Sequence, residues 1–556
     1  MRWGIFLTSL GLALYVSCRG NKAPPVSSPY YIGDSACLPC HADVVRAYKA
    51  TWKAHSLLPI TPQLERIEDF SQPAVYDKHT DFYYRAVWER DSLFLYEYRL
   101  KGKDTVHLRR ERLDFVIGSG HQTRSYLLWR NGFLYEAPLT WYTLPKKWDL
   151  SPGYAEGRNS RFSREIQPPC LSCHASRWEA IPWTYNRYQR VGGPIGCESC
   201  HGPGSSHVQN PKDTLYWWSR WTPAQQMDVC SRCHLEGIAV EKQIGWEPGK
   251  PLSQYWAIFL PERAELGQSG IASHAERLLR SACYKKGKVT CTTCHNPHPT
   301  QPIPSYEARC LSCHEAGCKK PDHPNRGCIG CHMPKSKASD IPHTRFTDHY
   351  IRVVREAPST APEQPQLVCA TETTPDSNVI AQAYLQWYTE EKPEPWILNR
   401  ALSYLPTKNK SPEVAARAYL LRGAYQQALP LAAQALQTDT TLPLLEMYAY
   451  LLELTGQIER ALKVWSELKQ RAPAYPEAHF RHTLLSFQLG RISPQAAYQE
   501  LLTLTRIQPW NAQFHYNAAV IAGLLGRQTE VKLHLQTALT FDPDYKAAQV
   551  AIRKLS

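Results

Sequence analysis

The sequence predicts a mainly α-helical protein in two parts: a loop-rich N-terminal domain with a small β-insertion, and a C-terminal α-solenoid of helical repeats. Three observations lead to this class. Between residues 31 and 353, short Cys-His motifs recur while periodic apolar runs are scarce. Aromatic, strand-like segments lie within about residues 80–145. From residue 379 onward the composition shifts to Ala, Leu and Gln with helical periodicity and evenly spaced glycines.

The first 30 residues are typical of an export segment followed by a tether. Arg2 precedes an apolar stretch from Trp3 to Ser17, which fits a signal peptide better than a membrane-spanning helix. Cys18 directly follows and resembles the lipidated first residue of a lipoprotein, with simple cleavage or an uncleaved anchor as alternatives. Residues 19–30 form the tether. We therefore expect an exported protein, periplasmic or at the cell surface, that is lipid-anchored at Cys18.

Seven copies of Cys-x-x-Cys-His dominate residues 31–353. Their cysteines are Cys37, Cys40, Cys170, Cys173, Cys197, Cys200, Cys230, Cys233, Cys291, Cys294, Cys310, Cys313, Cys328 and Cys331, and the histidines that follow are His41, His174, His201, His234, His295, His314 and His332. Two thiols at this spacing can add to the vinyl groups on one porphyrin edge, and the next imidazole can bind the iron. Structural zinc or a disulfide framework would not require the histidine. The motifs predict seven covalently attached haem c groups with these histidines as proximal ligands.

The sixth position on each iron decides what each haem can do. Only Met227 and Met333 lie in this region, so methionine can serve two irons at most. Histidine is more abundant, and ten histidines outside the motifs are available as distal ligands: His55, His79, His107, His121, His207, His274, His298, His323, His343 and His349. His79 and His107 are expected to face solvent in the β-insertion, and His323 is a spare. Full bis-histidine ligation would give low-spin, electron-transfer haems.

The net charge does not indicate a nucleic-acid partner. The formal charge is +14, but two propionates on each of seven haems would offset it. No basic run with interleaved aromatic residues is present. We expect no nucleic-acid binding, and we assign many of the Arg and Lys side chains to propionates and to the solvated surface.

The gap between His41 and Cys170 holds the predicted β-insertion. Residues 82–88 and 93–98 flank Glu-Arg-Asp-Ser and predict a hairpin. Residues 126–129 and 134–139 flank an Asn-Gly pair, which predicts a second hairpin.

A Pro- and Thr-rich linker, residues 354–378, separates the motif region from the helical domain, residues 379–556. Glycines recur there at intervals of 33, 34 and 36 residues: Gly423, Gly456, Gly490 and Gly526. Prolines recur at intervals of 36 and 34: Pro473, Pro509 and Pro543. This period predicts at least three tetratricopeptide repeats, in which the glycine allows close packing within a helix pair and the proline ends the second helix. An ordinary helical bundle is the alternative.

Two family resemblances add to this interpretation. The run from Cys197 to Gly204 with His207 after it, and Trp52-Lys53-Ala54-His55, resemble the tetrahaem cytochromes c that accept electrons from hydroxylamine oxidoreductase. This resemblance covers the first four motifs and implies His55 and His207 as distal ligands. It also implies that one haem is five-coordinate, because that family keeps one such haem.

The second resemblance covers more of the chain. It is carried by the segments 117–121, 148–154, 273–276, 293–298, 331–335, 341–343 and 348–349, which look like multihaem cytochromes fused to tetratricopeptide repeats. This resemblance favours His274, His298, His343 and His349 as ligands, and also His121. Cys283 and Cys318 lie beside the fifth and sixth motifs, either as a disulfide or as two free thiols.

Two functions fit the sequence. In the first, the haems form a wire that carries electrons between redox protein partners, one of which could be a membrane respiratory complex, and the repeats dock a partner. In the second, the protein is a multihaem oxidoreductase that acts on a small nitrogen or sulfur compound at one open haem. Every motif ends in His rather than the Lys of nitrite reductases, and distal histidines are in surplus. We therefore favour an electron carrier, associated with a membrane through its N-terminus.

Overall fold

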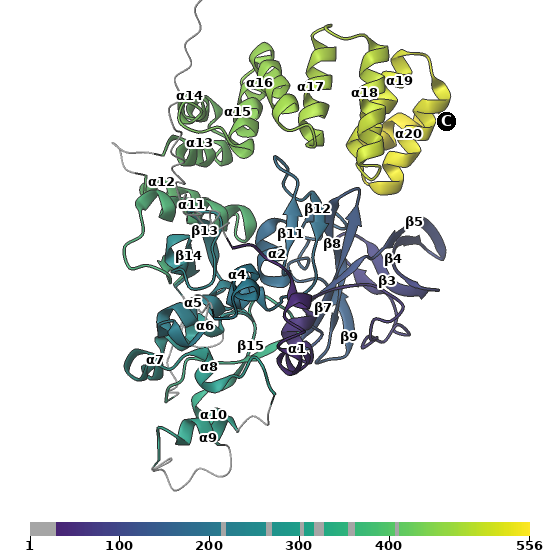
Figure 1. The fold of residues 1–556 in the computed structure, drawn as a ribbon. Helices are drawn as coiled ribbons and strands as arrows, with labels where there is room; N and C mark the ends of the chain where they lie inside the picture. Colours follow the sequence, from purple (N-terminus) through teal and green to yellow (C-terminus); the bar gives the residue numbers. More distant parts are fainter. Residues whose placement is uncertain are drawn as a thin grey trace, which may run out of the picture.

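The computed structural model describes residues 29–212, 218–262, 269–300, 305–315, 327–353, 362–405 and 411–555. The predicted signal segment with Cys18, most of the tether, His323, Cys318 and the start of the predicted linker lie outside these ranges. Antiparallel sheets and short helices make up the N-terminal half, and an array of longer helices makes up the C-terminal half (Figure 1). In the described ranges, no helix combines the length and apolar character needed to cross a membrane.

The prediction of a mainly α protein with a small β-insertion is wrong. Helix accounts for 43% and strand for 18% of the structure, and the sheets gather in the N-terminal half. Strands extend well beyond residues 80–145. Those outside this range are two to six residues long and carry no long alternating pattern, so sequence periodicity could not identify them.

Two antiparallel sheets form the largest β region. One sheet has the order β2 (Val75–Asp77), β3 (Phe82–Glu89), β4 (Ser92–Lys101) and β5 (Asp104–Arg112). The other has the order β1 (Leu57–Pro59), β6 (Phe115–Ile117), β7 (Thr123–Arg130), β8 (Phe133–Tyr142) and β10 (Arg164–Glu165), with β9 (Lys147–Leu150) also paired to β8. Side chains from both sheets share one core, which includes Tyr84, Leu95, Tyr126 and Leu139.

Both predicted hairpins are confirmed. Strand β3 pairs with β4 with Glu89 opposite Ser92 at the turn. Strand β7 pairs with β8, and the turn residues Asn131 and Gly132 have φ angles of 50° and 87°. Two successive positive φ angles define a type I′ turn, for which Asn-Gly is the favoured sequence. His107, expected to face solvent, is instead buried on β5.

The motif-bearing stretch consists of short helices and three small sheets. The helices are α1 (Ala42–Lys49), α2 (Pro168–His174), α3 (Glu198–His201), α4 (Ser205–Gln209), α5 (Pro223–His234), α6 (His274–Arg280), α7 (Ala282–Gly287), α8 (Cys291–Cys294), α9 (Tyr306–Leu311) and α10 (Gly327–His332). Short 3-10 helices are η1 (Asp34–Ala36), η2 (Trp52–His55), η3 (Trp218–Arg220) and η4 (Leu252–Gln254). The sheets pair β11 (Trp178–Ala180) with β12 (Tyr188–Val191), β13 (Ile238–Glu241) with β14 (Trp256–Pro261) and β17 (Leu367–Cys369), and β15 (Lys335–Lys337) with β16 (Arg345–Thr347).

The C-terminal half is an array of antiparallel helix pairs. It begins with α11 (Ser377–Glu390) and α12 (Pro395–Ser403), and four pairs follow: α13 (Pro412–Leu421) with α14 (Tyr425–Ala435), α15 (Leu442–Leu454) with α16 (Ile458–Arg471), α17 (Pro476–Gln488) with α18 (Pro494–Ile507), and α19 (Ala512–Leu524) with α20 (Gln528–Phe541). Helix α21 (Lys546–Arg553) comes last. A helix-pair array of this period agrees with the repeat prediction, and the assignment to the tetratricopeptide class remains our interpretation.

The recurring glycines have a different role from the one expected. Gly423, Gly456, Gly490 and Gly526 each follow the first helix of a pair with φ between 67° and 79°. A Cβ atom added at any of the four would meet no heavy atom within 4 Å. Glycine is therefore favoured by the left-handed conformation that ends the helix, and not by close packing.

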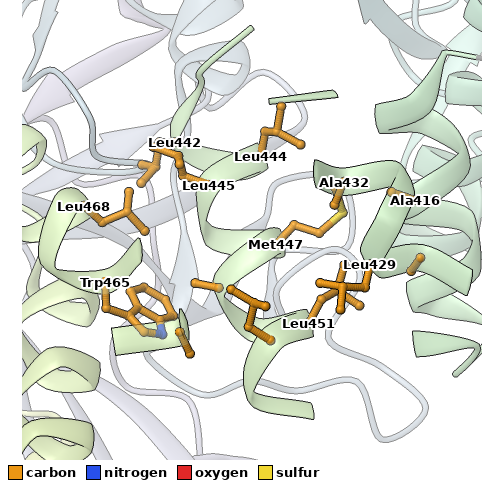
Figure 2. Packing of buried hydrophobic residues seen from close by; sticks show 14 of the residues in the cluster. Ala416, Leu429, Ala432, Leu442, Leu444, Leu445, Met447, Leu451, Trp465 and Leu468 are labelled. Atoms are coloured by element: carbon orange, nitrogen blue, oxygen red, sulfur yellow. The ribbon is translucent and has the colours of Figure 1, made fainter. Parts of the chain in front are cut away.

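Side chains fill the interior of the array. Trp465 and Leu468 of α16 are fully buried and pack with Leu445 and Leu451 of α15 (Figure 2). Leu429 of α14, in the preceding helix pair, belongs to the same buried cluster. A separate cluster joins α11–α13 to the sheet of β13, β14 and β17, so part of the segment predicted as linker forms a strand whose core continues into the array.

The array also docks on the large β region through the loops that follow its second helices. The carbonyl of Ala474, after α16, accepts a hydrogen bond from Arg187 at 2.9 Å. The carbonyl of Ile507, at the end of α18, accepts one from Asn131 at 2.9 Å. The carbonyl of Phe541, at the end of α20, accepts bonds from two arginines of the β region. Because carbonyls at a helix C-terminus lack partners within the helix, these donors satisfy them at the period of the repeat.

Candidate haem sites

Each Cys-x-x-Cys-His motif folds into one helical turn. The backbone N–H of the histidine donates to the carbonyl of the first cysteine in His41, His201, His295 and His314, at distances between 2.9 and 3.0 Å. In helices α2, α5 and α10 the motif forms the last turn. A helical turn places residues i, i+3 and i+4 on one side, so both thiols and the imidazole are presented together.

Protein surrounds several motif side chains without covering them fully. Burial lowers the pKa of His174 and His234, and burial raises the pKa of the Cys170 thiol and that of Cys200, the latter to about 11. Cys170 nevertheless has an exposed surface, and the other three are only partly covered. Thiols and imidazoles that protein surrounds but does not cover can accept a covalently attached macrocycle, so these residues fit haem c.

Three motif histidines each face a second imidazole in nearly parallel orientation. Ring centroids are 6.2 Å apart for His41 and His207, 5.8 Å for His201 and His298, and 6.1 Å for His295 and His349, with interplanar angles of 22°, 25° and 26°. Two imidazoles on opposite sides of one metal ion, each with a bond of about 2 Å, have centroids about 6 Å apart. The separation of the rings therefore leaves the distance that an iron between each pair requires.

The fourth motif has a more crowded environment. His274 approaches His234 edge-on, with centroids 5.4 Å apart and an angle of 81°, and it meets His349 at 4.7 Å. The Nζ atom of Lys53 lies 3.2 Å from Nε2 of His234. Two candidate groups therefore converge on this imidazole, one of which was not among the predicted ligands.

The remaining predicted distal histidines do not stack on a motif histidine within the described residues. His55 donates Nδ1–H to the carbonyl of Thr51 at 2.9 Å, and His121 packs on Trp52 with centroids 5.1 Å apart. His343 pairs with Asp149 of β9, Nε2 to Oδ2 at 2.8 Å. Likewise, none of the described imidazoles stacks on His174, His314 or His332, three of the predicted proximal ligands.

Thiols from different motifs touch one another. The thiols of four pairs of motifs lie close enough to influence each other's pKa: motifs one and three (Cys37 and Cys197), two and four (Cys173 and Cys233), four and five (Cys230 and Cys291), and six and seven (Cys310 and Cys328). The neighbouring Cys233 lowers the pKa of the Cys173 thiol to about 6. Since the thiols mark the porphyrin edge to which each haem is attached, neighbouring attachment edges meet at these four places.

Carboxylates hold the first and third motifs together. Glu198, inside the third motif, accepts hydrogen bonds from the backbone N–H groups of Ile32, Gly33 and Gly204 at 2.7–3.1 Å. In return Asp34 accepts one from the N–H of Cys197 at 2.8 Å. These carboxylates were missed in the sequence, because their partners lie more than 160 residues away and no local pattern reveals them.

A second buried ion pair positions His349. Arg277 of α6 donates to both carboxylate oxygens of Asp348 at 2.8 and 2.7 Å, and Arg352 donates to the same carboxylate at 2.9 Å. Burial raises the pKa of Asp348, but the hydrogen bonds from Arg277 and Arg352 outweigh it and the pKa is lowered. The ionised Asp348 therefore anchors the residue next to His349 opposite His295.

Cys283, one of the two cysteines considered for a disulfide, has a free thiol in the structure, and Cys318 lies outside the described residues. Among the residues that the structure describes, no group of three or more His, Cys, Asp or Glu side chains is arranged to hold a metal ion by itself.

Comparison with known proteins agrees with the haem interpretation. The family described as cytochrome c554 and c-prime matches residues 146–202, which include the second and third motifs. The chain is thus similar to multihaem cytochromes c, a class with covalently bound haem that transfers electrons outside the cytoplasm. More particularly, it is 25% identical over 199 residues to the multihaem cytochrome MtrA of Shewanella baltica (strain OS185). That match covers 30% of this chain and 56% of MtrA, so the chain spans about half the length of this relative.

Two solved structures have some likeness to part of this chain. A tetratricopeptide-repeat protein, YrrB, described as having an unusual peptide-binding site, is 20% identical, with a TM-score of 0.27, over 32% of this chain and 90% of its own. MamA from Desulfovibrio magneticus RS-1 is 15% identical, with a TM-score of 0.22, over 30% of this chain and 87% of its own.

Proposed function

We propose that this chain is an extracytoplasmic cytochrome with seven haem c groups that carries electrons between protein partners. The observation that carries the proposal is the series of contacts between thiols of different motifs. They link motif one to motif three, motif two to motif four, motif four to motif five, and motif six to motif seven. Helices α8 and α9, which carry residues of motifs five and six, also contact each other. Because electrons tunnel rapidly only across short gaps, such contacts favour conduction through the whole series.

The imidazole pairs support electron transfer rather than substrate binding at three of the irons. We assign His207 to the haem at His41, His298 to the haem at His201, and His349 to the haem at His295, in line with their stacked geometry. Two axial imidazoles leave no open position on the iron. His55, His121, His274 and His343 remain predictions, as do the motif residues themselves as haem ligands.

The haem count and ligation can be tested on the purified, full-length protein. A pyridine haemochrome assay with intact mass should give seven haems per chain, one for each motif. Replacing His207 with Ala should convert one haem to a high-spin form in the EPR spectrum while the count stays unchanged. A mass that accounts for six haems or fewer, or an unaltered spectrum in the variant, would refute the respective assignment.

A specific observation favours a second candidate, an oxidoreductase that reduces or oxidises a small nitrogen or sulfur compound. Within the described residues, no imidazole stacks on His174, and this histidine is deeply buried with Nδ1 unpaired. An iron bound there could keep an open position. Mixing reduced protein with nitrite, hydroxylamine, tetrathionate and oxygen separates the two functions: slow, unselective oxidation supports the carrier, and fast saturable turnover with one compound identifies an enzyme.

Partner docking through the repeats and membrane attachment through Cys18 complete the proposal. The loops after α16, α18 and α20 already bind the β region, so a redox partner would use the remaining surface of the array. Exposed apolar residues on α19 and α20, including Leu524 and Leu533, lie on that surface.

Membrane attachment through Cys18 can be tested by membrane fractionation. A Cys18→Ser variant should appear in the soluble fraction, whereas unchanged membrane association would exclude the lipid anchor.

A further inference from the structure

Lys53 lies at the nitrogen of His234 that a haem on the fourth motif would use. Its Nζ is 3.2 Å from Nε2 of His234, which is 181 positions further along the chain. The other ring nitrogen, Nδ1, is buried and makes no hydrogen bond with any residue that the structure describes. The lysine therefore meets the imidazole at the atom that is placed to bind iron.

Contacts on the C-terminal side of Lys53 fix the direction of this approach. Lys53 lies in the 3-10 helix η2, and Ser56 is the residue directly after this helix. The hydroxyl of Ser56 donates to the carbonyl of His174 at 2.8 Å and accepts a hydrogen bond from the N–H of Ile195 at 2.9 Å. The turn that carries Lys53 is thus clamped to the second motif and to the segment before the third.

His274 is the competing ligand. Its ring centroid lies 5.4 Å from that of His234 and 4.7 Å from that of His349, so it occupies the space between two motif sites and is closer to both rings than the about 6 Å that separates two imidazoles on one iron. Two nitrogen ligands on opposite sides of one metal ion lie about 4 Å apart. The amine of Lys53 would have to retreat by about 1 Å from its present position to reach that separation, and four methylene groups provide the freedom to do so.

We propose that Lys53 is the sixth ligand of the haem attached at Cys230 and Cys233, with His234 as the fifth. The amine would bind as the neutral base, which supplies one lone pair to the iron. This inference rests on the proposed function only in requiring haem at the fourth motif. One His/Lys site within a series of bis-histidine haems would differ from its neighbours in spectrum and in potential.

The test uses the full-length, haem-loaded protein and low-temperature EPR with near-infrared magnetic circular dichroism. Replacing Lys53 with Ala should remove one low-spin signal and produce one high-spin haem among seven, with the haem count unchanged. Adding a small primary amine should restore a low-spin signal in that variant, since it can take the vacated position. Lys53→Met should shift the signal instead of abolishing it, because a thioether can also bind iron.

Matched controls separate ligation from a structural role. Lys49→Ala removes an exposed lysine one turn earlier, at the end of α1, and should leave all signals unchanged. His274→Ala should also keep the low-spin signal that Lys53→Ala removes. The proposal is overturned if Lys53→Ala has the parent spectrum, or if His274→Ala alone creates the high-spin haem. These results are independent of substrate turnover, so they do not decide between electron carrier and enzyme.

Discussion

The motif-bearing helices and the helix-pair array build their interiors in different ways. Helix α15 alone has seven buried side chains, and Trp465 and Leu468 of α16 pack against them. Helices α7, α8, α9 and α10 are four to six residues long and have no buried side chain. Isolated helices of that length are unstable in water, whereas packed apolar faces stabilise longer ones. The comparison indicates that the array builds its core from its own side chains, whereas α7 to α10 need a further source of stability, which covalently bound haem would supply.

Preparing the protein without haem should give the largest difference between the two regions. Without haem attachment, we expect helices α7 to α10 to lose their structure, while the array from α13 to α20 stays helical because its core needs no cofactor. Limited proteolysis with mass spectrometry would map cleavage in both regions. Haem-loaded protein is the control. Equal protection of α7 to α10 in both forms would show that side chains alone stabilise these helices.

Trp465→Ala should give the next largest effect, a loss of stability that is limited to the array. The side chain is fully buried and its Nε1 donates to Glu453 at 2.6 Å. Truncating a buried aromatic side chain costs about 3–5 kcal/mol in the free energy of unfolding. Denaturant unfolding followed by far-ultraviolet circular dichroism measures this loss. Leu454→Ala, at an exposed site on α15, is the control, and a shift in the visible haem bands would contradict the separation of the two cores.

Low pH should weaken the joint, by which we mean the contacts between the large β region and the array. Burial raises the pKa of Glu97, but hydrogen bonds from Arg161 and His107 outweigh it and lower the pKa from its ordinary 4.5 to about 2. A carboxyl with a lowered pKa stabilises the fold above its unfolded pKa. This stabilisation, about 3 kcal/mol, is lost as the pH falls from about 4.5 to about 2.

Arg161→Ala tests this assignment, because Arg161 also donates to the carbonyl of Phe541 at 3.0 Å. The variant should move the acid transition to higher pH, as followed by hydrogen exchange in β4 and at the end of α20. Lys103→Ala, in the turn between β4 and β5, should leave the transition unchanged. An identical transition in Arg161→Ala and the parent protein would remove Glu97 as its source.

The smallest effect is expected for Asn131→Gly. Glycine keeps the positive φ of the turn, and the change removes only the hydrogen bonds from Asn131 to the carbonyls of Arg506 and Ile507. We expect a loss of about 1 kcal/mol. Denaturant unfolding measures it, and Asn131→Ala would give a larger loss because alanine is strained at φ of 50°. A loss of several kcal/mol in Asn131→Gly would mean that this contact dominates the joint.

Local patterns predicted the two hairpins and the helix pairs, because a turn sequence or a helical period lies within a few residues. The extent of the sheets was not predictable, since β1 and β10 are three and two residues long, respectively, and exist only through pairing with distant strands. The motif turns followed from the Cys-x-x-Cys-His spacing. The approach of Lys53 to His234 did not, because it depends on the folded positions of two segments 181 residues apart.

The hydrogen bonds of Glu198 and Asp34, which join the first and third motifs, have a consequence for biogenesis. In a chain that leaves the cytoplasm with its N-terminus first, Cys37 and His41 emerge long before Glu198, which holds the backbone of Ile32 and Gly33. His207, the imidazole opposite His41, emerges later still. With His207 as the second ligand, we expect the first motif to be completed only after about 170 further residues have followed it, so that its maturation depends on export of the third motif.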